Sequence, residues 1–339
     1  MPKSVVNSLH NINNHWQQQL AESITDPHEL LSLLQLSPQD FPDCHLASED
    51  FQLRVTRAFA AKIQPGDRHD PLLLQVMANR VERNIVAGFH SDPVGDLDAM
   101  PVPGLLHKYQ GRVLLVTTGA CAVHCRYCFR RHFPYNDHHP GRNDWQTALD
   151  YIRQRDDIHE VILSGGDPLV LSDQKLDKLI QAIAAIPHIK RLRIHSRLPV
   201  VLPDRITPEL LKLLSQTRLN VCMVIHANHA REVTAAEASV LEKLHYAGVT
   251  LLNQCVLLKG INDSLVAQIN LSETLYQHKV LPYYLHLLDP VQGAAHFHVD
   301  AKAATRLIQQ LQCRLPGYLV PRLVVEIAGE CSKIPVNKL

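Results

Sequence analysis

The sequence predicts an α/β fold, in which a partial (β/α)6 TIM-like barrel follows a mostly helical N-terminal region. The main observation is a change of pattern at residue 112, after which short apolar runs alternate with amphipathic stretches of helical length. This alternation is typical of βαβ units with a parallel sheet. The composition agrees, because 46% of the 339 residues are hydrophobic and 20% are charged, as in ordinary globular proteins. Six units fit a barrel or a partial barrel better than an open sheet, although spacing alone does not separate these.

The first part of the chain differs from the rest. Residues 28–36 and 71–83 carry helix-like apolar spacing. Three prolines between residues 93 and 103 then mark a loop. We therefore predict a mostly helical N-terminal region over 1–105 and a core domain over 106–339.

The elements of the core domain follow one another in a regular order. Thr207 before Pro208 and Glu209 predicts a helix start, with an N-cap, a proline in the first turn and an acid near the helix dipole. Gly248 follows its helix as a C-terminal glycine does. The expected strands are residues 112–118, 160–164, 191–196, 220–226, 249–257 and 282–288, with one more over 319–327. The expected helices are residues 144–155, 172–186, 207–216, 232–247, 263–279 and 300–315.

The charge balance speaks against some classes of protein. Lys and Arg number 34 and Asp and Glu number 33, so the chain has no electrostatic footprint for duplex nucleic acid or an anionic membrane. No apolar run approaches the roughly 20 residues that span a bilayer. The N-terminus lacks the apolar core of a signal peptide. We therefore predict a cytoplasmic protein whose eight cysteines stay reduced.

Three cysteines form the strongest motif. Cys121, Cys125 and Cys128 have the spacing C-x3-C-x2-C directly after the first predicted barrel strand. A zinc site would need a fourth ligand, which His124 or His132 would have to supply. A closed electron-transfer cluster would need a fourth cysteine. The third option is a [4Fe–4S] cluster on three cysteines, with one iron open to a small molecule. The remaining cysteines are predicted to be small buried hydrophobes: Cys44, Cys222, Cys255, Cys313 and Cys331.

With Tyr127 before the last cysteine, this motif resembles that of the radical S-adenosylmethionine (SAM) superfamily. The resemblance implies a radical SAM barrel in which the open iron chelates SAM, and one electron from the cluster cleaves SAM to a 5′-deoxyadenosyl radical. Gly165 and Gly166 follow the second strand. Alone they predict a tight turn. Beside the cysteine motif they resemble the glycine-rich loop that takes the SAM amino group.

Segments beyond the cysteines resemble the lysine 2,3-aminomutase family. The resemblance implies an isomerase that converts L-α-lysine to β-lysine, in the R form, with SAM and pyridoxal 5′-phosphate (PLP). It also implies a flavodoxin or ferredoxin as electron donor. The short form resembles the group that serves β-lysylation of elongation factor P (EF-P), in which a separate ligase attaches the β-lysine. The segments are 125–131, 163–169, 196–203, 226–229, 253–263 and 316–318.

Lys333 matches the family's PLP lysine, because it stands seven residues after an acid, Glu326. PLP needs a lysine for its Schiff base. Without the resemblance, Lys333 would be taken for a solvated C-terminal lysine. The sequence departs from the family here, since residues 328–332 read Ala-Gly-Glu-Cys-Ser where the mutases have a run of glycines. We expect a stiffer loop.

The resemblance also implies the substrate contacts. Arg130 matches the arginine that meets the substrate carboxylate, and a planar guanidinium suits a bidentate contact. Asp289 and Glu326 match the two acids that hold the ε-ammonium of lysine. Two carboxylates around one ammonium would reject a substrate that lacks the amine. Glu326 replaces an aspartate and is one methylene longer, which would alter the preferred substrate.

Further cofactor contacts follow in the same way. Tyr127, His226 and Gln254 match residues of the SAM pocket, although His226 and Gln254 would also serve as buried structural groups. Arg197 matches the family's contact to the PLP phosphate, with a structural ion pair as its alternative. Four histidines receive no role: His138, His139, His296 and His298.

Other functions stay open at this point. A mutase acting on another amino acid, such as glutamate or ornithine, is one alternative, and the two acids argue for a substrate with a terminal amine. A non-catalytic iron–sulfur or zinc module would need neither PLP nor Lys333. An RNA-modifying radical SAM enzyme is disfavoured by the net charge of +1. The longer mutases continue into a cysteine-rich zinc-binding tail, whereas this sequence ends at Leu339, so we expect no structural zinc and do not transfer the family's tetramer.

Overall fold

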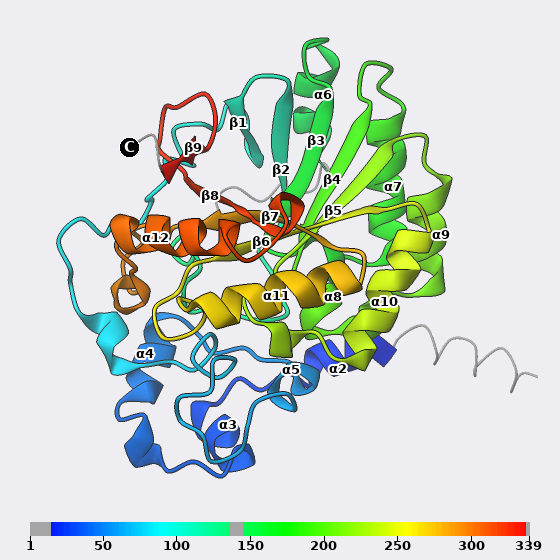
Figure 1. Cartoon of the computed structure of the whole chain (residues 1–339). Coiled ribbons are helices and arrows are strands. Elements are labelled where there is room, and N and C mark those ends of the chain that lie inside the picture. Colours follow the sequence, from blue (N-terminus) through cyan, green and yellow to red (C-terminus); the bar gives the residue numbers. More distant parts are fainter. Residues whose placement is uncertain (1–14, 136–144, 337–339) are drawn as a thin grey trace, which may run out of the picture.

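A curved sheet of nine strands lies at the centre of the computed structural model, which describes residues 15–135 and 145–336 (Figure 1). The spatial order of the strands follows the chain. Seven strands are parallel, and an antiparallel strand lies at each edge. The strands are β1 (Leu105–Tyr109), β2 (Arg112–Thr118), β3 (Glu160–Gly165), β4 (Arg191–Ser196), β5 (Asn220–Ile225), β6 (Thr250–Val256), β7 (Leu281–His286), β8 (Arg322–Val325) and β9 (Ile334–Pro335).

The predicted parallel strands are confirmed. The six expected barrel strands are β2 to β7, and the additional one is β8. Among the described residues β1 does not pair with β9, so the sheet stays open and the barrel is partial. The prediction missed both edge strands. Only Gln110 and Gly111 separate β1 from β2, so β1 does not stand out as an apolar run of its own. Strand β9 has only two residues, which is too short for a recognisable apolar run.

The helices that follow the strands lie along the outer side of the sheet (Figure 1). The Thr207 side chain accepts the backbone N–H of Leu210, as the predicted N-cap requires. Gly248 has a φ of 85°, which is the left-handed conformation expected after a helix. None of the described helices is long and apolar enough to cross a membrane. The α-helices are α6 (Gln146–Arg153), α7 (Asp173–Ala184), α8 (Leu198–Val201), α9 (Pro208–Gln216), α10 (Ala235–Tyr246), α11 (Leu265–Gln277) and α12 (Ala301–Gln312).

The N-terminal segment contributes short helices to the same hydrophobic core as the barrel. The expected helix over 28–36 is α3, which ends three residues early. The α-helices here are α2 (His15–Ala21), α3 (Pro27–Leu33), α4 (Cys44–Asp50) and α5 (Arg57–Ala60). Short 3-10 helices are η1 (Pro38–Asp40), η2 (Arg80–Arg83), η4 (Pro168–Val170), η5 (Pro203–Arg205), η6 (Ala230–Glu232), η7 (Ala295–Phe297) and η8 (Gly317–Leu319).

The helix predicted over 71–83 was wrong. Only η2 is regular there, and the preceding residues form turns. The buried carboxylate of Asp70 accepts the backbone N–H groups of Leu72 and Leu73, which fixes a turn. The apolar side chains in this segment are buried, so their spacing correctly indicated burial but not a helix.

A buried ion pair fastens the N-terminal segment to the loop after β2. Arg126, which is 0% exposed, donates from Nε and Nη2 to both carboxylate oxygens of Glu82, at 2.8 and 2.5 Å. Its Nη1 donates to the carbonyl of Phe51 at 2.6 Å. Arg131 adds a contact of 2.8 Å to the same carboxylate. Two guanidinium groups and one carboxylate are thus buried together between the cysteine loop and residues 47–82.

Replacing Glu82 by glutamine leaves two buried guanidinium groups without a counter-charge. We expect the free energy of unfolding to fall by about 3–5 kcal/mol. Urea-induced unfolding followed by circular dichroism measures it. The matched control is Glu29→Gln, because the Arg57–Glu29 pair is 55% and 45% exposed, and a surface pair contributes about 0–1 kcal/mol. A loss for Glu82→Gln no larger than that of the control would contradict the fastening role.

Candidate active site

A cavity of about 480 Å³ opens where the loops after the parallel strands meet. This edge is where the active sites of such barrels are found. All the site residues predicted from the sequence line it: Cys121, Cys125, Tyr127, Cys128, Arg130, Gly165, Gly166, Arg197, His226, Gln254, Asp289, Glu326 and Lys333.

The three cysteines lie on one wall of this cavity. Burial raises the pKa of the Cys128 thiol to about 11, with a further contribution from Cys125. Burial and the neighbouring Cys128 raise the pKa of Cys121 well above its usual range. Thiolates are therefore disfavoured here unless a positively charged centre compensates them. Three thiols of this kind on one wall fit the donor set of a [4Fe–4S] cluster.

The two glycines after β3 pack directly onto the cysteine loop. The Gly166 N–H donates to the carbonyl of Thr118 at 2.7 Å, and the Asp167 N–H donates to that of Ala120 at 2.8 Å. A Cβ atom on Gly166 would lie 2.3 Å from the Ala120 oxygen, which is a collision. Gly165 has a φ of 105°, a conformation that other residues rarely adopt. The backbone of this loop thus has no side chains at two successive positions and lies against the cysteine loop. A loop that binds SAM through its backbone requires this arrangement.

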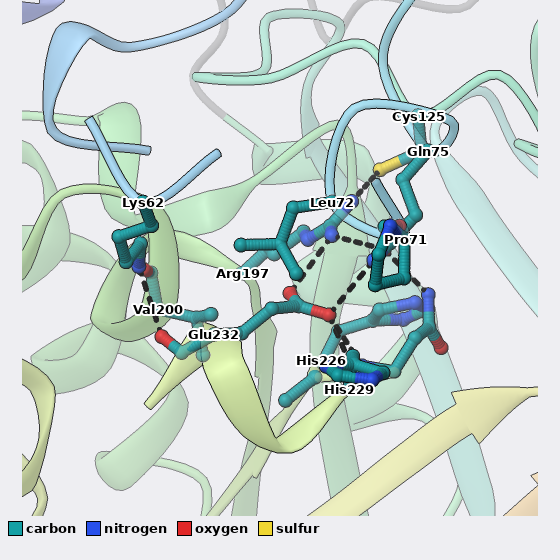
Figure 2. Close-up of polar contacts among 12 residues, drawn as sticks. Lys62, Pro71, Leu72, Gln75, Cys125, Arg197, Val200, His226, His229 and Glu232 are labelled. Atoms are coloured by element: carbon teal, nitrogen blue, oxygen red, sulfur yellow. Dashed lines mark hydrogen bonds and ion pairs between the residues drawn. The ribbon is translucent and has the colours of Figure 1, made fainter. Parts of the chain in front are cut away.

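Arg197 lies against the cysteine loop. Figure 2 shows its guanidinium between the sulfur of Cys125, to which Nη1 donates at 2.7 Å, and Glu232. Its Nη2 donates to Glu232 at 2.9 Å and to Gln75 at 2.6 Å. This is the structural ion pair that the sequence left as an alternative. The contact to a PLP phosphate stays a prediction, and both Nη groups are engaged here by other partners. Gln75 and Glu232, which the sequence analysis missed, lie 122 and 35 positions from Arg197 in the chain.

Tyr127 and His226 form a stacked pair in the cavity wall. Their ring centroids are 5.6 Å apart at an interplanar angle of 18°, and the tyrosine hydroxyl lies 3.0 Å from Nε2 of His226. Burial and the charge of Arg197 lower the pKa of His226 to about 3. The imidazole is therefore neutral and presents a flat face. Gln254 reaches the same cavity from β6.

A chain of ion pairs runs along another part of the wall. Lys333 contacts Glu326, and Lys108 donates to the other oxygen of Glu326 at 2.9 Å. Lys108 also contacts Asp96 at 2.6 Å, and Asp96 accepts from Nε of Arg130 at 2.6 Å. Burial opposes ionisation of Glu326, but Lys333 and Lys108 outweigh it and hold the pKa at about 2.

The hairpin of β8 and β9 explains why Lys333 meets Glu326. The two strands are antiparallel, and Val325 lies opposite Ile334. Glu326 and Lys333 are the next residues along each strand, so they face each other across the start of the turn. Asp96 and Lys108 were not predicted, because Asp96 lies in the proline-rich loop and Lys108 in the missed strand β1.

Four buried polar atoms of the cavity wall have no hydrogen-bond partner among the described residues. They are Oδ1 of Asp289, Nε2 of both His195 and His286, and Nε of Arg197. Burial, followed by the charge of Glu326, raises the pKa of Asp289 to about 7. Burial and nearby cations hold the pKa of both histidines well below its usual range, so these imidazoles are neutral. Buried polar groups in proteins are normally paired, so these open atoms are candidates for contacts to a ligand.

Sequence analysis missed these two histidines, although a signal was present. In β4, residues 191, 193 and 195 are polar and alternate with apolar residues, which places them on one face of the strand. His286 ends β7 in the same row of strand ends. Polar residues at alternate positions of a barrel strand indicate a face that lines a site.

The other histidines named in the sequence analysis do not line the cavity where the structure describes them. His124 and His132, the candidate zinc ligands, contact the carbonyls of Gln52 at 2.8 Å and Gln292 at 3.1 Å and do not line it. The ring of His296 packs at a tilt of 40° against Phe297 with centroids 3.9 Å apart, and burial lowers its pKa to about 4. His298 packs edge-on against Phe89. His138 and His139 lie outside the described residues.

Comparison with known proteins shows first the superfamily and then the family of this chain. Residues 115–269 match the model of the radical SAM superfamily. An L-lysine 2,3-aminomutase from Escherichia coli is 48% identical over 323 residues, 95% of this chain and 94% of that protein. One from Haemophilus influenzae is 49% identical over 94% of each chain, and one from Clostridium subterminale is 36% identical over 95% of this chain and 78% of its own.

The chain therefore belongs to the lysine 2,3-aminomutase family of radical SAM isomerases. The cofactors of this family are a [4Fe–4S] cluster, SAM and PLP. Among solved structures, a radical SAM methyltransferase from Sphaerobacter thermophilus aligns with 68% of this chain and 72% of its own, at 16% identity and a TM-score of 0.46. That similarity is too remote to say anything of the site.

Replacing Gly166 by alanine forces its Cβ against the Ala120 carbonyl and pushes the cysteine loop out of place. We expect the anaerobically reconstituted variant to retain less than about half of the wild-type iron and sulfide, since a shift of about 1 Å is enough to spoil a site. Iron and sulfide analysis per chain measures it. Gly317→Ala is the matched control, because a Cβ there meets nothing within 4 Å. Equal cluster content in both variants would contradict the close packing.

Proposed function

We propose that this chain is an L-lysine 2,3-aminomutase, which converts L-α-lysine into (R)-β-lysine with a [4Fe–4S] cluster, SAM and PLP. The observation that carries the proposal is one cavity of about 480 Å³, which is lined by three thiols, two glycines and a lysine paired to an acid. Relatives named L-lysine 2,3-aminomutase, at 48% and 49% identity, support lysine as the substrate.

The reaction explains why such a site needs two organic cofactors. Migration of an amino group from C2 to C3 requires removal of hydrogen from an unactivated C3–H bond, which no side-chain base can achieve. Bound SAM, with the cluster, supplies a carbon radical for that removal, and PLP supplies a conjugated ring for the migrating nitrogen. The protein positions these groups and keeps water away from the radical.

The chain's own residues divide this work. Cys121, Cys125 and Cys128 are proposed to hold the cluster. Gly165 and Gly166 let SAM approach the backbone, and the neutral Tyr127–His226 pair and Gln254 line its pocket. Lys333 is proposed as the PLP lysine. It stands 21% exposed on the cavity wall, next to an acid that can hold its ammonium whenever the lysine is free.

The substrate ends are assigned by charge. Arg130 uses Nε for Asp96, so its Nη groups remain for the substrate carboxylate. Asp289 and Glu326 are proposed to face the distal ammonium. Arg112 is our candidate for the PLP phosphate in place of Arg197, because it lines the cavity and has no acidic partner among the described residues.

The biological setting extends the proposal further. The resemblance to the EF-P group supports use of the β-lysine by a separate ligase that modifies EF-P. We propose a cytoplasmic enzyme that receives its electron from a flavodoxin or ferredoxin. We also propose that residues 1–105 form a region that covers the cysteine loop, and that residues 106–339 form the radical SAM core with the PLP lysine near its end.

The first test is an anaerobic assay of the reconstituted protein with SAM, PLP, dithionite and L-lysine. Chiral chromatography with mass detection follows (R)-β-lysine. We expect product with wild type and a loss of at least about 10³-fold with Lys333→Ala, because the variant has no amine for PLP. The matched control is Lys259→Ala, an exposed lysine outside the cavity that should leave turnover unchanged.

The assay also separates the other functions. An intact cluster, bound PLP and SAM cleavage without β-lysine would reject free L-lysine as substrate. Failure to bind PLP at all would favour a non-catalytic iron–sulfur protein.

Binding of L-lysine should depend on pH through Asp289. Its pKa is raised to about 7, so the carboxyl is mostly neutral at pH 6 and mostly ionised at pH 8. Only the ionised form pairs with an ammonium, so we expect the Kd for L-lysine to fall by up to about tenfold over this range. Titration of the protein in the presence of PLP measures it. Asp289→Asn should remove the difference, and an unchanged pH profile in this variant would contradict the assignment.

A further inference from the structure

Tyr135 contacts both the cysteine loop and the glycine loop (residues 165–167) without lining the cavity itself. Its hydroxyl donates to the carbonyl of Gly165 at 2.8 Å, 30 positions further along the chain. Its ring packs on the backbone of Gly119, where a Cβ atom would lie 2.8 Å from both Cβ and Cγ of the tyrosine. One side chain thus joins the loop after β2 to the end of β3, and none of the contacts proposed above uses it.

We propose that Tyr135 is a positioning residue for SAM: it locks the glycine loop against the cysteine loop, so that the amino acid part of the cofactor meets a fixed backbone surface. This inference rests on the proposed function, because it assumes that these two loops bind SAM together. Sequence analysis did not single out Tyr135, which lies seven residues after Cys128 and outside the cysteine motif.

The peptide group between Gly165 and Gly166 is held at both ends. Its carbonyl accepts from Tyr135, and its N–H donates to the carbonyl of Thr118 at 2.7 Å. The plane of this peptide therefore cannot rotate without breaking a hydrogen bond. Because glycine has the greatest backbone freedom of all residues, a loop with two successive glycines depends on such contacts for a fixed shape.

The far end of the glycine loop is fixed as well, and one acceptor stays open. The Asp167 N–H donates to the carbonyl of Ala120 at 2.8 Å, and the Asp167 carboxylate accepts the backbone N–H of Arg197 at 2.7 Å. No donor from residues 15–135 or 145–336 contacts the carbonyl of Gly166, a residue that lines the cavity. The open carbonyl follows directly on the peptide that Tyr135 holds, so its direction depends on that contact.

The hydroxyl and the ring of Tyr135 can be tested separately. Burial raises the pKa of Tyr135 well above its usual range, so the hydroxyl keeps its proton and acts as the donor to Gly165. At Gly119 the three nearest atoms that a Cβ would meet all belong to Tyr135, and the backbone there is not left-handed. Gly119→Ala would therefore act by displacing Tyr135, which moves its hydroxyl off the carbonyl.

Binding of two ligands tests this role. The holoenzyme carries its cluster and PLP and is kept without L-lysine and reductant, so that SAM is not consumed. SAM and 5′-methylthioadenosine, which lacks the amino acid part of SAM, are titrated separately by calorimetry. Iron and sulfide are measured per chain, and affinities are compared per assembled cluster. The proteins are wild type, Tyr135→Phe, Gly119→Ala, the double variant and Tyr246→Phe, whose tyrosine is 78% exposed and outside the cavity.

We expect Tyr135→Phe to keep the wild-type iron and sulfide, because its ring still packs on Gly119. Its Kd for SAM should rise roughly three- to tenfold, the value of one hydrogen bond, while that for 5′-methylthioadenosine should stay within about twofold. Gly119→Ala should show the same selective loss. The double variant should lose no more than the larger single loss, because both changes remove one hydrogen bond. Tyr246→Phe should match wild type.

Other results overturn the proposal. Equal losses of both ligands in Tyr135→Phe would mean a general disturbance of the pocket, and an unchanged Kd for SAM would mean that the hydroxyl positions nothing. Additive losses in the double variant would show two separate effects.

Two further outcomes still give a decision. If Tyr135→Phe assembles no cluster, the selectivity of Gly119→Ala decides, and if 5′-methylthioadenosine binds too weakly to titrate, additivity with SAM alone decides. A selective loss in a protein whose wild type forms no β-lysine in the complete assay would reject the proposed reaction and leave this inference standing.

Discussion

The cysteine loop is held by buried ion pairs on both sides, and the rest of the site is arranged around it. Glu82 binds Arg126 and Arg131, and Glu232 binds Arg197, which in turn contacts the sulfur of Cys125. The loop buries Ala122 and Val123 in the main hydrophobic core and Tyr127 in a second cluster. Its position is set in addition by charges that would be expensive to leave unpaired. These pairs connect the N-terminal segment, the loop after β2 and the loop after β4 into one rigid wall.

The opposite requirement holds where the substrate is expected. The polar groups of a rigid wall can all be paired within the protein, but a binding surface must leave some polar groups unpaired for its ligand. The orphaned atoms of Asp289, His195 and His286 are of this kind, and all three residues line the cavity. Ion-paired groups thus fix the cysteine loop, while these three residues present open polar atoms to the cavity.

Most of the fold could be predicted, because β and α periodicity and helix caps are local signals. The cysteine motif was found for the same reason, as a motif of a few residues, whereas Lys333 was indicated only by the resemblance to the family. What was missed depends on distant pairing. Nothing near Arg197 in the sequence indicates Glu232, and Lys108 lies in a strand too close to β2 to be recognised. The helix predicted over 71–83 was wrong because a hydrogen bond to Asp70 fixes a turn there, which apolar spacing cannot reveal.

The hairpin that ends the described chain places a different limit on how this site can vary. Lys333 faces Glu326 because Val325 and Ile334 pair, and side chains alternate along a strand. A shift of this pairing by one residue would turn Lys333 to the other side of the strand. The residues of the turn are largely exposed, and nothing lies near the Cβ position of Gly329, although its φ of 84° favours glycine there. The register of the two strands is thus constrained while the turn requires a glycine at one position, so a chain without a run of glycines can still present the lysine to the same acid.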